Sequence, residues 1–186
     1  ILHGGNFYGG HVCFALDGLK SAVASTADLL DRQLALLCVP ETSGGLPGNL
    51  VPSNGGHSVD SGFKAMQIAA SALAAEAQKL SLPASAFSRS TESHNQDKVS
   101  MGTIAARDAL RALELAETVA AILLLAGCQA LDLRGGASRR RSRALHDAVR
   151  KEVPMLRADR RQDRDIAGVL AALRAGSLPL AGLDPI

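Results

Sequence analysis

The stretch VSMGTIAARDALRALELAETVAAILLLAGCQALDL, residues Val99 to Leu133, decides the fold. It contains no proline, and its alanines and leucines recur at the three- and four-residue steps of an α-helix. A helical pattern of this length is typical of a coiled coil or a long bundle helix. Its many alanines permit close contact on more than one side. We therefore expect a long helix surrounded by other helices, including helices of other subunits.

Four further stretches have a helical pattern, at residues 11–38, 63–80, 139–151 and 163–175. The first carries one apolar stripe that ends before Pro40, because proline cannot continue a helix. Hydrophobic residues make up 47% of the chain and aromatic residues only 3%, so Ala and Leu dominate the apolar content. Both are strong helix formers, and strand-like alternation is rare. The sequence predicts an all-α protein built as a long-helix bundle.

A long loop separates the first two of these helices. Residues 41–62 are rich in Gly, Ser and Asn and exceed the usual length of a connection. Loops of this length within a compact domain are usually functional or mobile.

Charge is spread unevenly along the chain. The net charge is +2, but residues 134–164 contain eleven Lys/Arg and four Asp/Glu. We therefore divide the chain into residues 1–134, part of the central bundle with its loops, and residues 135–186, a basic C-terminal helical segment. The run Arg139 to Arg143 has no interleaved aromatic residue for base stacking, and acidic residues follow it. We expect a solvated helix start and no nucleic-acid partner.

The chain contains three cysteines, an odd number, at the widely separated positions Cys13, Cys38 and Cys128. This spacing favours free buried thiols in a reduced protein. The first residues do not resemble a signal peptide, and the apolar runs are too short or too interrupted to cross a bilayer. We expect a cytoplasmic protein with no membrane contact.

The stretch STESHNQDKVSMG, residues 90–102, places five polar side chains ahead of the long helix: Glu92, His94, Asn95, Gln96 and Asp97. Helix capping by Asp97 or Ser93 accounts for one or two of these residues. A zinc site lacks convergent ligands, and a serine hydrolase lacks its nucleophile elbow. The glycines at 4–10 fit neither phosphate-binding pattern. We expect no metal, and the cluster calls for a different explanation.

Four motifs taken together resemble the aromatic amino-acid ammonia-lyases, the family of histidine, tyrosine and phenylalanine ammonia-lyases and related aminomutases. They are HGGNFYGGHVCFALDGL (3–19), GLPGNLVP (45–52), SGF (61–63) and HNQDKVSMGTIAAR (94–107). Their order and spacing are similar to those of the family, and the resemblance extends to about Arg134.

The resemblance implies the C-terminal segment of the ammonia-lyase fold, which has a fumarase/aspartase-like helical core. Family members are homotetramers whose active sites draw on more than one subunit. Their electrophile is a methylidene-imidazolone ring, self-formed from an internal Ala-Ser-Gly that this sequence lacks. The resemblance therefore implies a missing N-terminal part that supplies this group. We expect the present chain alone to have no lyase activity.

The resemblance also assigns site residues. Glu92 and Gln96 match the catalytic polar side of the site, while Asn6, Phe7 and Asn95 match residues that contact the prosthetic group or the substrate. Histidine lyases carry glutamate where this chain has Gln96, so glutamine favours Tyr or Phe as the substrate. The expected reaction is removal of ammonia to give an aryl acrylate.

Three alternatives remain open. An aromatic aminomutase shares the scaffold and returns the ammonia to the β-carbon. A histidine ammonia-lyase shares the reaction. From another class, the chain could be a non-catalytic helical module that serves only oligomerisation.

Overall fold

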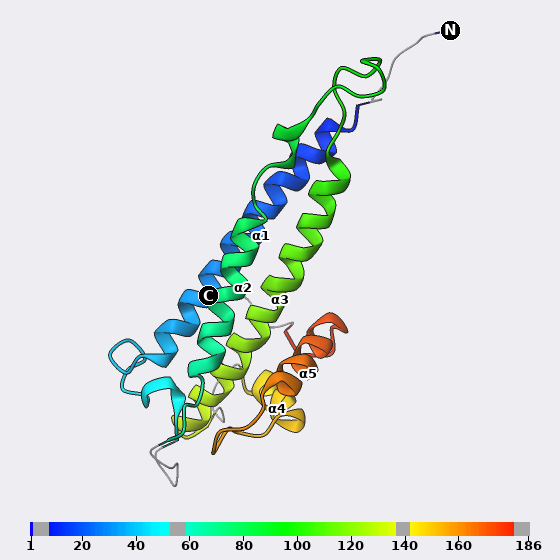
Figure 1. Cartoon of the computed structure of the whole chain (residues 1–186). Helices are drawn as coiled ribbons and strands as arrows, with labels where there is room; N and C mark the ends of the chain where they lie inside the picture. The colour runs from blue at the N-terminus through cyan, green and yellow to red at the C-terminus, as the bar shows by residue number, and fades with distance from the viewer. Residues whose placement is uncertain (2–7, 53–58, 137–141, 181–186) are drawn as a thin grey trace. The chain divides into compact units, whose positions relative to one another are not determined.

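The computed structural model describes residues 1, 8–52, 59–136 and 142–180, and nearly all of its regular structure is helical (Figure 1). Its elements are α1 (Gly10–Cys38), η1 (Gly48–Leu50), α2 (Lys64–Lys79), η2 (Ala84–Phe87), α3 (Gly102–Leu133), α4 (Arg143–Glu152) and α5 (Asp163–Arg174). Within these residues the only β pairing is an isolated bridge between Thr91 and Gln96. The predicted all-α class is confirmed.

Most predicted helix positions agree with the structure. α1, α2 and α5 lie within a residue or two of their predicted bounds, and α4 is described from Arg143 onwards. The long helix α3 ends at Leu133 as predicted, but it begins at Gly102 and not at Val99. It ends in glycines, as the sequence suggests: Gly136 N–H donates to Leu131 O at 2.7 Å, with φ +93° at Gly136.

The chain forms two compact units. Unit 1 comprises residues 1–29 and 72–116, and unit 2 comprises residues 30–71 and 117–186. The helices α1, α2 and α3 each contribute residues to both units. The functional boundary near residue 134 that the charge pattern suggests stays a prediction.

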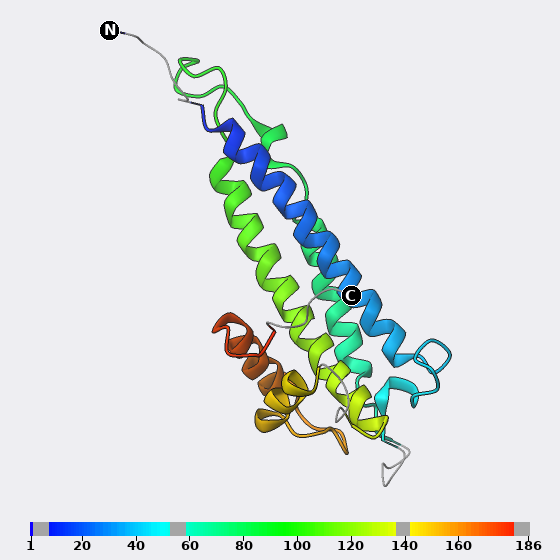
Figure 2. The same ribbon diagram turned by 180° about the vertical axis from the view of Figure 1, so that it is seen from behind.

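Small side chains form the core of unit 1, where α1, α2 and α3 lie side by side (Figures 1 and 2). The cluster consists of Ala24, Ala27, Ala74, Ala77, Leu115 and Ala116. Alanine at facing positions lets helix backbones approach closely, and burial of these apolar groups stabilises the packing by roughly 25 cal/mol per Å². Alanines that the sequence predicts to allow close helix contact thus lie in the buried core of unit 1.

A buried ion pair joins three segments of unit 1. The side chain of Lys20 on α1 is fully buried, and its Nζ lies 2.9 Å from Asp17 Oδ1 and 3.6 Å from Asp108 Oδ2 of α3. The same Nζ donates to Leu82 O at 2.7 Å. An ammonium withdrawn from water needs such partners, because desolvation without them costs several kcal/mol.

Asp17 completes this arrangement by capping η2. Its two carboxylate oxygens accept the N–H groups of Ala84 and Ser85, both at 2.9 Å. Burial raises the pKa of Asp17, but the hydrogen bonds from Ser85, Lys20 and Ala84 outweigh burial and hold that pKa well below its usual range. The carboxylate is therefore ionised and fixes the chain that leads into the loop after η2.

In unit 2, the buried side chain of Gln129 holds two connecting segments by hydrogen bonds to their backbone groups. Its buried side chain donates to Leu156 O at 2.8 Å and to Leu50 O at 3.3 Å, and it accepts from Leu156 N at 3.0 Å. The Gln129 carboxamide thus supplies hydrogen-bond partners to backbone groups of two connecting segments, which would otherwise be buried without partners.

The entry to α2 depends on Gly62. Its φ is +56°, and a Cβ at this position would lie 2.5 Å from Asn49 O. The Asp159 carboxylate accepts the N–H groups of Ser61 and Gly62 at 2.8 and 2.9 Å. A left-handed backbone, a close approach and a carboxylate cap therefore define the end of the long loop.

The three thiols are free and buried, as predicted. Burial raises the pKa of both Cys38 and Cys128 to about 11, so these thiols are weak nucleophiles at neutral pH. No helix in the described part of the chain is long and apolar enough to cross a membrane.

Replacing Lys20 by Met should destabilise the protein by about 3 to 5 kcal/mol, because it leaves the Asp17 carboxylate buried beside an apolar group. Chemical denaturation followed by circular dichroism measures this change. Lys64→Met, at an exposed position on α2, is the matched control and should change the free energy of unfolding by less than about 0.5 kcal/mol. Equal stability of the two variants would contradict the role of Lys20.

The pH dependence of Asp17 provides a second test. A carboxylate with a depressed folded pKa stabilises the protein above its unfolded pKa of about 3.9, and this contribution is lost as the pH falls toward the folded pKa. The difference in unfolding free energy between the natural chain and Asp17→Asn should be constant from about pH 5 to 7 and shrink below about pH 4. A difference independent of pH would show that ionisation of Asp17 is irrelevant.

Candidate active site

The polar stretch after η2 forms a loop that is fastened at its base. Ser88 Oγ donates to Val99 O at 2.7 Å and so joins the two ends of the loop. Ser100 Oγ donates to Gly9 O at 3.0 Å and accepts from Gly102 N at 3.1 Å. The loop is thereby tied both to the start of α3 and to the residue that precedes α1.

The tip of the loop is a tight turn from Thr91 to Gln96. The N–H of Thr91 donates to Gln96 O at 3.0 Å, and the N–H of Gln96 donates to Thr91 O at 3.3 Å. Inside the turn, Glu92, Ser93 and His94 have φ values of +53°, +52° and +66°. Non-glycine residues in this region cost about 1 to 3 kcal/mol each and cluster at functional sites. The backbone strain marks this turn as a candidate site.

The turn brings three of the predicted site residues together. Asn95 Nδ2 donates to Glu92 Oε2 at 3.4 Å, and Asn95 N donates to Glu92 O at 2.9 Å. The side chain of Gln96 forms no hydrogen bond to any described residue. All three side chains are exposed in the single chain. A carboxylate and two carboxamides are thus presented together, able to accept from and donate to a polar ligand.

The capping role considered for Asp97 or Ser93 is wrong. Because α3 begins at Gly102, both residues lie outside its first turn, and that turn contains no acidic residue. The first helical N–H is met by Ser100, which lies between the polar turn and the helix. The cluster therefore occupies a loop of its own and does not form the mouth of the helix.

The other two predicted site residues, Asn6 and Phe7, lie outside the described residues. The chain is described again from Tyr8, which lines a hollow of about 380 Å³ with Gly10, His11, Phe14, Ser85 and Lys98. Lys98 follows Asp97 directly, so this hollow adjoins the base of the polar loop. Sequence reasoning predicts no site role for His11, Ser85 or Lys98. Two of them, His11 and Lys98, lie within the quoted motifs, whereas Ser85 has no sequence signal.

Among residues 1, 8–52, 59–136 and 142–180, no group of three or more His, Cys, Asp or Glu side chains is placed to hold a metal ion, and the expected absence of a metal stays a prediction. His94 Nδ1 pairs instead with Ser90 Oγ at 3.1 Å.

The fold and the strained polar turn define an all-α chain that carries its polar chemistry on a loop ahead of its longest helix. A family model described as aromatic amino acid lyase matches residues 1–151. The chain belongs to the aromatic amino acid lyase family, a family of lyases.

Similar proteins include several activities. The chain is 41% identical over 180 residues to a tyrosine ammonia-lyase of Cupriavidus metallidurans, covering 96% of this chain and 33% of that protein. It is 38% identical over 182 residues to a histidine ammonia-lyase of Koribacter versatilis, covering 97% and 35%. The chain therefore spans about one third of the length of these curated relatives.

Similar solved structures also include more than one activity of this family. A tyrosine aminomutase from Streptomyces globisporus has a TM-score of 0.88 at 37% identity, covering 94% of this chain and 33% of that one. A histidine ammonia-lyase from Trypanosoma cruzi has a TM-score of 0.87 at 36% identity, covering 95% and 34%.

Replacing Ser100 by Ala should loosen the base of the loop, because it removes the hydroxyl that bridges Gly9 O and Gly102 N. We expect a loss of about 0.5 to 2 kcal/mol, the range of a helix-terminal hydroxyl. Amide hydrogen exchange, read by mass spectrometry, should become faster across residues 88–102. Ser93→Ala, exposed on the turn, is the matched control. Unchanged exchange in the Ser100 variant would contradict this anchoring.

Proposed function

We propose that the chain is the C-terminal part of an aromatic amino acid ammonia-lyase that eliminates ammonia from Tyr or Phe to give an aryl acrylate. The observation that carries this proposal is the strained turn that gathers Glu92, Asn95 and Gln96 in a chain of the aromatic amino acid lyase family. The 41% identity to a tyrosine ammonia-lyase supports the substrate class.

The reaction has two physical difficulties: an amine is a poor leaving group, and the β-proton is weakly acidic. Glu92 is an exposed carboxylate at the turn, where it can hold the substrate ammonium and take one of its protons before the C–N bond breaks, which frees the nitrogen lone pair for reaction with the electrophile. Asn95 already donates to Glu92 at 3.4 Å and so orients that carboxylate. Glu92 and Gln96 are the groups to which we assign the catalytic roles.

The methylidene-imidazolone group fits the donor set of this turn. Asn95 and Gln96 each offer an N–H₂ donor and a carbonyl acceptor, and the Gln96 side chain is uncommitted to any described residue. Asn95, Asn6 and Phe7 are the residues we assign to contact with this group or the substrate. When bound, it supplies the electrophile that turns the amine into a leaving group. This chain has no Ala-Ser-Gly, so we assign the source of the group to an N-terminal part outside it.

Assembly as a homotetramer is part of the proposal. Large apolar side chains are exposed on the unit 1 portions of α1 and α3, including Phe14 at 75% and Leu110 at 64%. Apolar exposure of this kind is typical of a surface that another subunit covers. The polar turn is likewise exposed in the single chain, which agrees with the expectation that this chain, lacking Ala-Ser-Gly, has no activity alone.

Other partners are less well supported. Carboxylates already engage several arginines of the basic segment, with Arg150 2.7 Å from Asp132, Arg160 2.8 Å from Asp165 and Arg161 2.6 Å from Asp163. These pairs leave less free charge for nucleic-acid phosphates. The three free thiols favour a reducing, cytoplasmic location.

An aminomutase is the second candidate, because a tyrosine aminomutase structure aligns with a TM-score of 0.88. The polar turn serves either reaction, since both begin by removing the amine. Product analysis separates them: the lyase releases an aryl acrylate, and the aminomutase releases a β-amino acid.

Substituting the turn in the full-length lyase tests the proposal. Glu92→Gln and Gln96→Ala should each lower kcat for Tyr or Phe by about 10²- to 10⁴-fold, the usual contribution of a proton-transferring or orienting group. The appearance of aryl acrylate is followed by its ultraviolet absorbance. Gln78→Ala, exposed on α2, is the matched control and should retain activity.

Native turnover in both turn variants, with assembly intact, would favour the non-catalytic oligomerisation module. Formation of urocanate from His at a higher kcat/KM than product from Tyr or Phe would assign the chain to a histidine lyase.

A further inference from the structure

Unit 1 contains a second hollow, separate from the polar turn, which we term the α2–α3 groove. It has a volume of about 580 Å³ and lies between the end of α2, the segment through η2 and the first turns of α3. Its lining includes Lys79, Leu82, Phe87, Arg89, Met101 and Ile104.

The body of the groove is apolar. Leu82, Phe87 and Ile104 are 62%, 49% and 41% exposed, although each is a large hydrophobic residue. Several such residues around one hollow mark a binding surface more often than chance exposure does. The volume falls in the range of small-molecule pockets, about 300 to 1,000 Å³. A docked helix would need a longer series of anchors, so the size favours a small ligand.

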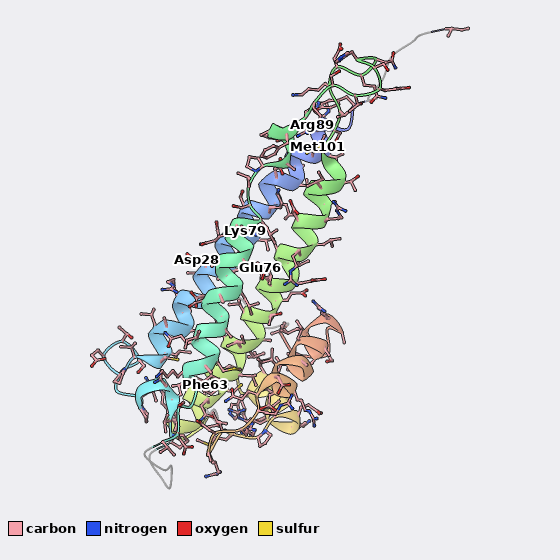
Figure 3. The ribbon with its side chains drawn as sticks, in the orientation of Figure 1. Asp28, Phe63, Glu76, Lys79, Arg89 and Met101 are labelled. Atoms are coloured by element: carbon pink, nitrogen blue, oxygen red, sulfur yellow. The ribbon has the colours of Figure 1, made fainter. Side chains whose placement is uncertain are left out.

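The rim of the groove is cationic. Lys79 and Arg89 are exposed, and neither has a carboxylate partner among the described residues. Figure 3 shows Arg89 close to Met101, where the polar loop joins α3, and Lys79 further along α2. The one carboxylate in the lining, Asp108, is already 3.6 Å from the buried ammonium of Lys20. Arg89 Nε donates to Phe87 O at 3.4 Å, which leaves the other guanidinium N–H groups beside the apolar floor, while Lys79 adds a second positive charge elsewhere on the rim.

We propose that the α2–α3 groove binds an aryl carboxylate, with the ring against Leu82, Phe87 and Ile104 and the carboxylate held by Arg89. The positive charge on the rim favours a ligand with an anionic group, and the apolar floor favours a ligand with a hydrophobic ring. The choice of an aryl acrylate within this class rests on the proposed function, since that is the product of the proposed reaction.

Occupancy of the groove bears on the polar turn through the chain itself. Arg89 and Met101 lie at the two ends of the loop that carries Glu92 and Gln96, and the Ser88–Val99 hydrogen bond joins these ends. A ligand that contacts both residues holds the base of the loop. Accumulating product would thus act on the loop by contacting its base.

The test is isothermal titration of the 186-residue chain with trans-cinnamate. We expect saturable binding with one site per chain, and a Kd at least about tenfold weaker in the Arg89→Gln variant, because a charge-assisted contact is lost. Arg107→Gln, which neutralises one exposed Arg outside the groove, is the matched control and should bind as the natural chain does. Circular dichroism verifies the fold of each variant.

Four outcomes would overturn the proposal. Equal binding of the neutral cinnamamide would exclude recognition of the carboxylate, and equal binding of octanoate would exclude recognition of the ring. Loss of binding in Glu92→Gln/Gln96→Ala, but not in the groove variant, would place the ligand at the polar turn. Absence of saturable binding would show that the groove is no ligand site. The titration does not depend on turnover. The ligand site can therefore be confirmed even if the proposed lyase reaction is wrong, and the lyase reaction can be confirmed even if the groove binds no ligand.

Discussion

The fully buried ammonium of Lys20 is the constraint on which the rest of unit 1 depends. It must be neutralised, and Asp17 does so while capping η2 through Ala84 and Ser85. The lysine also donates to Leu82 O, so one charge fixes α1 against the segment that leads into the polar loop. Replacement of such a pair by apolar residues can be neutral, but removal of one partner is costly. We interpret the pair as setting the position of the loop more than adding to stability.

Fixed at its base, the loop can present a strained turn at its tip. Three consecutive residues with positive φ gather a carboxylate and two carboxamides, and Ser100 ties the loop to the residues before α1. In the single chain this turn is exposed, as are large apolar side chains of α1 and α3. The same surface features therefore support both parts of the proposal: assembly with other subunits and a site completed by that assembly.

The sequence allowed most of the fold to be predicted, because helix periodicity and the punctuation by Pro40 and the glycines after Leu133 are local signals. The start of α3 was predicted three residues too early, because Val99 and Met101 continue the apolar pattern of the helix. In the structure, the Ser100 hydroxyl accepts from Gly102 N and donates to Gly9 O, so the helix begins after it. No local signal could have shown that Lys20 is buried, since its partners include residues more than 60 positions away. Glu92, Asn95 and Gln96 were predicted from family motifs, whereas the positive φ values that bring them together are a property of the folded loop.

The central claim is that the polar turn faces a cavity once the lyase is assembled. Carbodiimide labelling of Glu92, measured by mass spectrometry, tests this most directly, with the exposed Glu152 as an internal reference. We predict that Glu92 labels readily in the isolated chain, that it is protected in the full-length assembly, and that a bound aromatic amino acid strengthens the protection. Equal labelling of Glu92 in the isolated chain and in the assembly would place the turn in open solvent and contradict the account.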